Sequence, residues 1–326
     1  MKTPIAVLIS DVHYNLSTLP LADAAMRQAI NKANQLDIPL IVCGDLHDTK
    51  AAMRAECVNA MIETFKLCKI KPFVLVGNHD RINEKAPAHS LNFLTPYAEI
   101  IEDRGKYTDQ LFLVPYEHDP ESLRNFLRHM PKGAILIMHQ GLQNSHMGDY
   151  IHDKSAINKS DVAGFRVISG HYHTRQSIDL PDNGTWDYVG NPFTLTQGEA
   201  NDPEKGFQVL HSDGTLDFIP TNLRRHRVWE CSPDLVPIGE YSPGDILTIK
   251  VRGTHEELSG ITRSKVQEKT GIEFFKLDLI PTAAETKAPE VLSLNQGELL
   301  DNLIDSLSNT SDDRKTNLKE LWRRLS

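Results

Sequence analysis

Residues 40–48, with the sequence LIVCGDLHD, join a short apolar run to a glycine and then to two aspartates. A run of this length is typical of a buried strand, and the glycine lets the backbone turn sharply where the strand ends. Asp45 and Asp48 would then follow the carboxyl end of that strand. In open α/β sheets these ends converge on one crevice, so the stretch predicts a ligand site there.

Four further stretches of the chain have the same design, an apolar run followed at once by polar residues. The runs predict core strands at residues 5–9, 73–76, 135–138 and 167–168. The polar motifs behind them are Asp11-Val12-His13, Gly77-Asn78-His79-Asp80, His139-Gln140-Gly141 and Gly170-His171-Tyr172-His173. Predicted helices over residues 21–36 and near 51–68 alternate with the first strands. This alternation predicts an α/β fold in which the five motifs lie together at one edge of the sheets.

The five motifs bring together carboxylate oxygen, amide oxygen and imidazole nitrogen, and no cysteine. This donor set suits manganese, iron or zinc better than copper(I), and it is too rich in nitrogen for calcium. Taken singly the motifs have an ordinary alternative, since Asn, Gly and Asp all favour turns. Gly-His-x-His is more specific, because alternate residues of an extended segment point the same way. All five in this order indicate two divalent metals that share a carboxylate and activate a water.

The motifs resemble those of the calcineurin-like metallophosphoesterase superfamily, whose pattern is D-x-H, G-D-x-x-D, G-N-H-D/E, H and G-H-x-H. The resemblance covers residues 1–225. It implies that the first metal ion is held by Asp11, His13 and His173, and the second by Asn78, His139 and His171. Asp45 would bridge the two ions. It also implies that His79 contacts the phosphate or protonates the leaving oxygen, with Asp48 orienting His79.

Within the superfamily the chain is similar to SbcD-type DNA nuclease subunits of bacteria and phages. Thr49-Lys50 follows the second motif and Val76 precedes the third, where serine/threonine protein phosphatases carry an arginine beside each. His139-Gln140-Gly141 resembles the histidine motif of these nucleases, whereas Tyr14-Asn15 replaces their common Leu-Gly. The likeness implies manganese-dependent exonuclease and single-strand endonuclease activities in DNA repair or recombination. It also implies a homodimer and an SMC-like ATPase partner of the SbcC type.

Behind the motifs the sequence becomes β-rich, with tight turns expected at residues 182–184 and 212–214. A basic connector at 224–227 leads to a Pro- and Gly-rich stretch. A small β-α-β unit is expected after it, with a strand over 246–251, a helix over 256–269 and a strand over 272–279. Pattern and resemblance together predict a two-sheet metallophosphoesterase sandwich flanked by helices, with a capping domain and a helical tail. The expected boundaries are 1–225 for the nuclease domain, 226–282 for the DNA-capping domain, and 283–326 for linker and tail.

The predicted tail begins with a polar linker at residues 281–290, which contains two prolines. Two amphipathic helical patterns follow, over residues 299–307 and 318–325. These helices either pack on the parent domain or bind a partner. The linker favours the partner, and the resemblance identifies it as the coiled-coil base of the ATPase.

The composition limits the possible partners and compartments. A net charge of −9 argues against a generally basic nucleic-acid coat, although bound metals would add local positive charge. The apolar runs are far shorter than the ~20 residues of a membrane span, and no basic, apolar leader opens the sequence. We therefore expect a soluble cytoplasmic protein without a membrane partner. The four cysteines are too few and too scattered for a disulfide framework and are interpreted as buried free thiols.

Two other functions fit the same residues. The first is a phosphatase or phosphodiesterase for small phosphate esters or nucleotides, which would need neither the capping unit nor the tail. The second is a scaffold that has lost its chemistry, and the complete ligand set argues against it. Several basic residues have two interpretations. His47 has either a role in the site or no role at a variable position of the second motif. His146 and His152 either border the cleft or lie on a surface loop, and Arg224, Arg225 and Arg227 either contact DNA phosphates or form a solvated connector.

Overall fold

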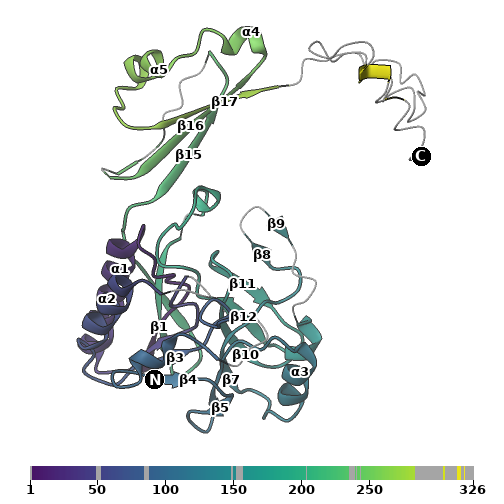
Figure 1. The fold of residues 1–326 in the computed structure, drawn as a ribbon. Helices are drawn as coiled ribbons and strands as arrows, with labels where there is room; N and C mark the ends of the chain where they lie inside the picture. Colours follow the sequence, from purple (N-terminus) through teal and green to yellow (C-terminus); the bar gives the residue numbers. More distant parts are fainter. Residues whose placement is uncertain are drawn as a thin grey trace.

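The computed structural model describes residues 2–48, 53–83, 88–147, 150–151, 157–202, 204–234, 239, 241–242, 244–282, 304, 314–316 and 319. They form a larger layered domain, which holds the N-terminus, and a smaller domain built on β15, β16 and β17 (Figure 1). The chain passes from the first to the second between β14 (Leu216–Pro220) and β15 (His226–Cys231).

Two six-stranded sheets form the centre of the larger domain. The first has the order β14-β13-β1-β2-β3-β4, with β13 at Gly206–His211, β1 at Pro4–Ile9, β2 at Leu40–Val42, β3 at Phe73–Leu75 and β4 at Glu99–Ile101. The second has the order β11-β12-β10-β7-β6-β5. Its strands are β11 at Gln176–Asp179, β12 at Thr185–Tyr188, β10 at Arg166–Gly170, β7 at Ile135–His139, β6 at Leu111–Val114 and β5 at Gly105–Lys106. Neighbours in the middle of each sheet run parallel, and the outer strands β11, β5, β13 and β14 pair antiparallel.

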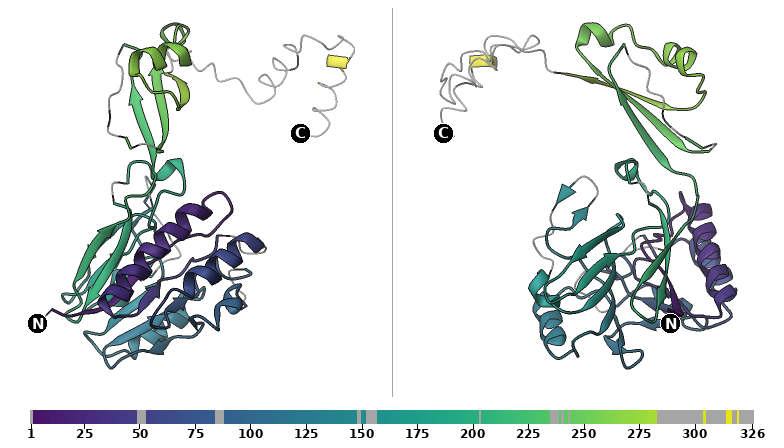
Figure 2. Two further views of the ribbon diagram at one scale, coloured as in Figure 1. Left: turned by 90° about the vertical axis from the view of Figure 1, so that its left-hand side faces the viewer. Right: turned by 180° about the vertical axis from the view of Figure 1, so that it is seen from behind.

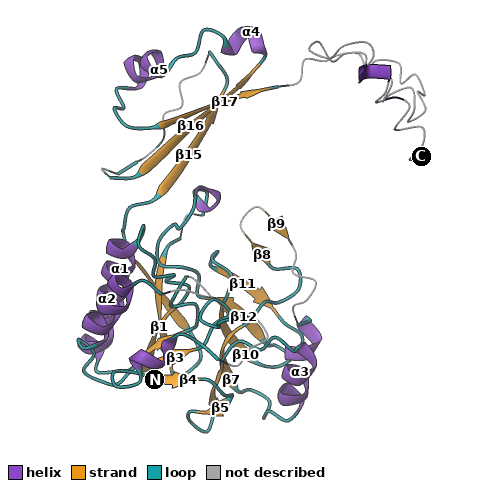
Figure 3. Cartoon of the chain, in the orientation of Figure 1, coloured by secondary structure: helices purple, strands orange, loops and turns teal. Residues whose placement is uncertain are grey.

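The two sheets pack face to face through apolar side chains. Helices pack on their outer faces, also through apolar side chains. Along β1, Ala6 and Leu8 pack toward the second sheet, while Val7 and Ile9 pack toward the helices. Such burial on both faces is expected of parallel strands, whose sequences are almost continuously apolar. Helices α1 (Leu19–Leu36) and α2 (Ala55–Phe65) lie side by side on the first sheet, and α3 (Pro120–Arg128) covers the second (Figures 2 and 3). The predicted α/β sandwich of two sheets flanked by helices is confirmed.

The two predicted tight turns are also present. Asp182 and Asn183 both have a φ of 58° and join β11 to β12 as an antiparallel hairpin. Gly214 has a φ of 80°, and its N–H donates to His211 O in the turn between β13 and β14. Asn, Asp and Gly tolerate this left-handed backbone, which explains why these turns were visible in the sequence.

The smaller domain is a three-stranded parallel sheet of β15, β16 (Ile246–Gly253) and β17 (Lys276–Pro281). Its own apolar core includes Leu247, Ile249 and Phe275. Strand β15 was not predicted, because its first residues, His226 and Arg227, belong to the stretch that resembles a basic connector. The single helix predicted over 256–269 is wrong: the chain forms α4 (His255–Leu258) and α5 (Arg263–Thr270), since Thr262 caps a new helix after Gly260. The last strand begins at residue 276, four residues later than predicted.

The remaining short elements are η1 (Leu91–Leu94), β8 (His146–Met147), β9 (Tyr150–Ile151), η2 (Lys159–Val162) and η3 (Gln197–Glu199). The predicted tail lies almost wholly outside the described residues; Ile304, residues 314–316 and Lys319 are described, and all are helical. Within the described part of the chain, no helix has the length and apolarity to cross a membrane. All four cysteines are free thiols, and Cys43 and Cys57 are buried.

Candidate metal centre

The five motifs lie where five neighbouring strands end. Asp11, Asp45 and Asn78 follow β1, β2 and β3 of the first sheet, His139 ends β7 of the second, and His171 follows β10. These strands run parallel within each sheet, so their carboxyl ends meet at one edge of the sandwich. The structure therefore brings together all the residues to which the sequence assigned metals.

The backbone at this edge adopts conformations that residues other than glycine rarely take. Asp11, His13, Asp45 and His171 have φ angles of 52°, 48°, 51° and 89°. Such conformations cost free energy and persist when the surrounding structure requires them, which is typical of functional sites. At Gly77 a Cβ atom would collide with the side chain and backbone N of Asp45. The glycine of the third motif thus lets the second and third motifs touch.

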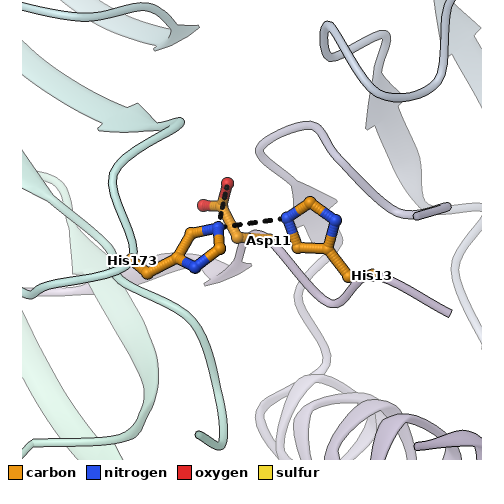
Figure 4. A group of neighbouring side chains, drawn as sticks. All are labelled: Asp11, His13 and His173. Carbon is orange, nitrogen blue, oxygen red and sulfur yellow. Dashed lines mark hydrogen bonds and ion pairs between the residues drawn. The ribbon is translucent and has the colours of Figure 1, made fainter. Parts of the chain in front are cut away.

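The first candidate group of metal ligands is Asp11, His13 and His173 (Figure 4). Their side chains converge although 160 residues separate His13 from His173. His13 Nε2 lies 3.1 Å from His173 Nε2, and His173 Nε2 lies 4.0 Å from Asp11 Oδ1. Asp11 is fully buried and accepts the backbone N–H of His171 at 3.1 Å. This group is a compact pocket of one oxygen and two nitrogen donors.

The second group is Asn78, His139 and His171, with Asp45 beside it. Asn78 Oδ1 lies 2.9 Å from His171 Nδ1 and 3.1 Å from His139 Nε2. Asp45 Oδ2 lies 3.3 Å from His139 Nε2 and 3.8 Å from His13 Nε2. Asp45 therefore stands between the two groups, which is the position that a bridging carboxylate needs.

The ring nitrogens on the outer side show that these donors fit metal ions. His139 Nδ1 lies 2.7 Å from the carbonyl of Cys43, and His173 Nδ1 lies 2.9 Å from the carboxylate of Glu199. Both nitrogens must donate there, because a carbonyl or carboxylate only accepts. Nε2 is then the ring atom left to bind a metal, and it lies 3.1 Å from Asn78 Oδ1 in His139 and 3.1 Å from His13 Nε2 in His173. Imidazole, carboxylate and amide donors brought together in this way suit divalent transition metals.

The charges of the site favour a cation as well. Burial by itself would raise the pKa of the Asp45 carboxyl, but His139 and His13 outweigh it and hold that pKa well below its usual range. Burial would lower the pKa of His139, but the charges of Asp45 and Asp11 outweigh it and raise the pKa to about 9. The cluster thus attracts positive charge, which is a proton in the metal-free protein. A metal ion would displace that proton on binding.

Asp80, the last residue of the third motif, has a structural role. Its carboxyl accepts the backbone N–H groups of His47 at 2.9 Å and Gly77 at 2.8 Å. Burial raises the pKa of Asp80 to about 6, and the charge of Asp45 acts in the same direction. Asp80 therefore links the backbone of the second motif to that of the third. His47 itself is buried, and a role of its side chain in the site stays a prediction.

His79 and Asp48 lie at the open side of the two groups. His79 Nδ1 lies 2.9 Å from the backbone carbonyl of Asp48, and its backbone N–H donates to Asp45 Oδ1 at 2.8 Å. The predicted contact between Asp48 and His79 is therefore made by the backbone. The Asp48 carboxylate instead lies 3.3 Å from His13 Nδ1, which lowers the pKa of that carboxyl. The roles assigned to both residues stay predictions.

Three further residues of this site carry no signal in the sequence: Glu199, Asn191 and Lys205. Glu199 contacts His173, and Asn191 donates to Glu199 Oε2 at 2.8 Å. Burial alone would raise the pKa of Glu199, but the hydrogen bond from His173 and nearby positive charge outweigh it and lower the pKa to about 2. A glutamate after a Gln-Gly turn resembles any surface acid, so only the structure reveals this contact.

For the other basic residues singled out in the sequence, a role at the cleft or on DNA stays a prediction. His146 is exposed on β8, and its backbone N–H donates to Gln176. Arg227 pairs with Asp245 at 3.2 Å in the small domain, and Arg224 is exposed. His152 lies outside the described residues.

Fold and donor set together fit a phosphoesterase with candidate metal-binding clusters. Residues 6–175, slightly more than half of the chain, match the sequence model of the calcineurin-like phosphoesterases. The chain therefore belongs to the calcineurin-like phosphoesterase family, as its motifs predicted, and the family supports phosphoester hydrolysis.

Two known proteins extend this comparison. The chain is 27% identical over 218 residues to exonuclease subunit 1 of Enterobacteria phage T4. The match spans 62% of this chain and 62% of the length of that relative. A solved dimetal phosphatase from Danio rerio is a more distant likeness, with 12% identity and a TM-score of 0.39 over 63% of this chain and 92% of that one.

Proposed function

We propose that the chain is a metal-dependent DNA nuclease with exonuclease and single-strand endonuclease activities. The observation that carries the proposal is the similarity to a phage exonuclease subunit over 218 residues. That length exceeds the 170 residues (6 to 175) of the family match, so the likeness is not limited to the shared phosphoesterase motifs. Manganese is the proposed metal because the resemblance to SbcD-type nucleases implies it, and the mixed oxygen and nitrogen donor set is compatible with it.

The chain's own residues explain how this site would cut a phosphodiester. Two bound metals supply Lewis acidity to the phosphate oxygens and lower the pKa of a water. Asp11, Asp45 and His139 form the buried floor, and His79 stands half-buried at the mouth. The Asp48 carbonyl engages His79 Nδ1, which leaves Nε2 as the ring atom to meet a substrate. From there His79 contacts the phosphate or gives a proton to the departing sugar oxygen.

The small domain contributes to a cavity near the proposed metal site. Its sheet and η3 line a cavity of about 430 Å³, with Gln197 and Asn201 on one side and Glu230 and Lys250 on the other. Glu199, in the same short helix as Gln197, touches the ligand residue His173. A DNA strand bound at the metals would therefore pass close to this cavity. We assign the capping role to residues 226–282 for this reason.

We also infer that the protein works as one subunit of an SbcC/SbcD-like complex in DNA repair or recombination. The T4 relative is a subunit by name, which supports a second subunit for this chain. The amphipathic sequence of residues 283–326 is the proposed contact with an SMC-like ATPase. A homodimer is proposed from the family resemblance alone.

The alternative is a phosphatase or phosphodiesterase that acts on small esters or nucleotides. It is favoured by one observation, namely that residues 6–175 hold all seven proposed ligands. On this alternative, truncation after residue 285 would leave substrate specificity unchanged.

The test is to incubate the full-length protein with Mn²⁺ and labelled linear DNA, in parallel with bis-p-nitrophenyl phosphate. Degradation of DNA that is lost in the His79→Ala variant supports the nuclease. Efficient turnover of the small ester beside intact DNA would contradict it and favour the alternative.

A further inference from the structure

Glu199 uses both of its carboxylate oxygens inside the protein. Oε1 accepts Nδ1–H of His173 at 2.9 Å. Oε2 accepts Asn191 Nδ2–H at 2.8 Å and the backbone N–H of Leu195 at 3.0 Å. A carboxylate held at both oxygens has little rotational freedom, so the position of Oε1 is fixed with respect to the His173 ring.

A buried lysine balances the charge of this carboxylate. Lys205 is 1% exposed, and its Nζ lies 3.5 Å from Glu199 Oε2 and 2.7 Å from Asp202 Oδ2. The same ammonium donates to Asn191 Oδ1 at 2.5 Å and to the backbone carbonyl of His173 at 3.2 Å. Burying a lysine is costly unless it is paired and hydrogen-bonded, and here all these partners surround His173 and Glu199. The network therefore holds the side chain and the backbone of one ligand residue together.

The two proposed metal sites differ in this support. In the second site, the outer nitrogen of His139 meets a backbone carbonyl, that of Cys43. In the first site, the outer nitrogens of His13 and His173 lie 3.3 Å and 2.9 Å from the carboxylates of Asp48 and Glu199. A carboxylate makes the imidazole a more basic ligand than a carbonyl does. Loss of one carboxylate should therefore weaken the first site and leave the second.

We propose that Glu199 is a positioning residue for the first metal site: it fixes the tautomer of His173 so that Nε2 faces the ion, and Asn191 and Lys205 hold it in place. The inference rests on the proposed two-metal function but not on DNA as the substrate. Glu199 does not touch the ion itself; it acts through His173. Outer-shell carboxylates of this kind change metal affinity by roughly 10- to 100-fold.

The test is calorimetric titration of the metal-free, full-length protein with Mn²⁺ alone. Glu199→Gln should weaken one of two Mn²⁺ sites by roughly 10- to 100-fold and leave the other within a factor of about two. Glu204→Gln is the matched control, since it removes the same charge five positions away. Glu204 pairs with Arg175 on the surface and has no described contact with His173. Its titration should match that of the wild type.

A second variant separates positioning from folding. Lys205 keeps its pair with Asp202 when Glu199 is changed, so the Glu199 variants should fold. The second variant is Glu199→Asp, which keeps the negative charge beside Lys205 but withdraws the carboxylate from the His173 ring. A melting temperature of the metal-free variant close to that of the wild type, with a lower Mn²⁺ affinity, supports a positioning role, as does a hydrolysis rate that returns at high Mn²⁺ concentration.

Equal Mn²⁺ affinities of wild type and either Glu199 variant, in folded protein, would overturn the inference. So would a loss of affinity that is equal at both sites. A protein that binds two Mn²⁺ ions but cuts no DNA would contradict the proposed substrate and leave the role of Glu199 standing.

Discussion

At the scale of single residues, His79 is predicted to act in the chemical step and not in metal binding. It lies beside both ligand groups, with its ring 4.8 Å from that of His13, yet its Nδ1 is engaged by a carbonyl. His79→Ala should therefore keep Mn²⁺ affinity and lower the rate of DNA hydrolysis by about 10²- to 10⁴-fold, the usual contribution of a general acid. Rate measurements at saturating Mn²⁺, together with calorimetry, check this. A variant that loses Mn²⁺ as well would show that His79 is a ligand.

Asp11 and His171 test the ligand assignment itself. Asp11→Ala removes a buried oxygen donor of the first group, and His171→Ala removes a nitrogen donor of the second. Each variant should lose detectable hydrolysis while its circular dichroism stays that of the wild type, because no core packing is removed. His146→Ala, on exposed β8, is the control and should keep full activity. Full activity of either ligand variant would show that the residue does not hold a metal.

At the scale of elements, the strand ends were predictable and the supporting shell was not. Strands such as β2 and β7 are apolar runs that end in a motif, so both their place and their side chains at the site followed from the sequence. Glu199 lies in η3, which has no periodicity and no apolar pattern. Strand β15 was hidden because its first residues, His226 and Arg227, are polar and pair only with residues distant in the chain. Local sequence patterns predict strands and helices that local interactions determine. They do not predict contacts between residues distant in the chain, such as those of Glu199 and β15.

The turn after β3 gives a prediction that belongs to this scale. A Cβ atom on Gly77 would meet the side chain and backbone of Asp45, so Gly77→Ala should push the second and third motifs apart. Overpacking of this kind costs about 1–3 kcal/mol of unfolding free energy. Denaturant titration and Mn²⁺ calorimetry should show loss of both stability and affinity. Gly105→Ala, at a position where nothing lies within 4 Å, should change neither. An unchanged Mn²⁺ affinity in Gly77→Ala would mean that this close contact does not shape the site.

At the scale of the whole molecule, the metals should stabilise the larger domain. The site gathers the buried carboxylates of Asp11 and Asp45, and ions that bind only the folded chain add about 2.7 kcal/mol per site at a hundredfold excess over the Kd. For a domain of this size each kcal/mol raises the melting temperature by roughly 2–4 °C. Thermal denaturation with and without Mn²⁺ should therefore differ by several degrees, and chelation should reverse the shift. In the His171→Ala variant the shift should shrink; an equal shift there would place the bound ions elsewhere.

The central claim is a pair of metals bound by seven residues from five strand ends. Anomalous diffraction from crystals of the full-length protein grown with Mn²⁺ tests it most directly. Two peaks per chain are expected, one within bonding distance of Asp11, His13 and His173, the other of Asn78, His139 and His171, and both beside Asp45. A single peak, or peaks away from these side chains, would contradict the two-metal site and the reaction proposed for it.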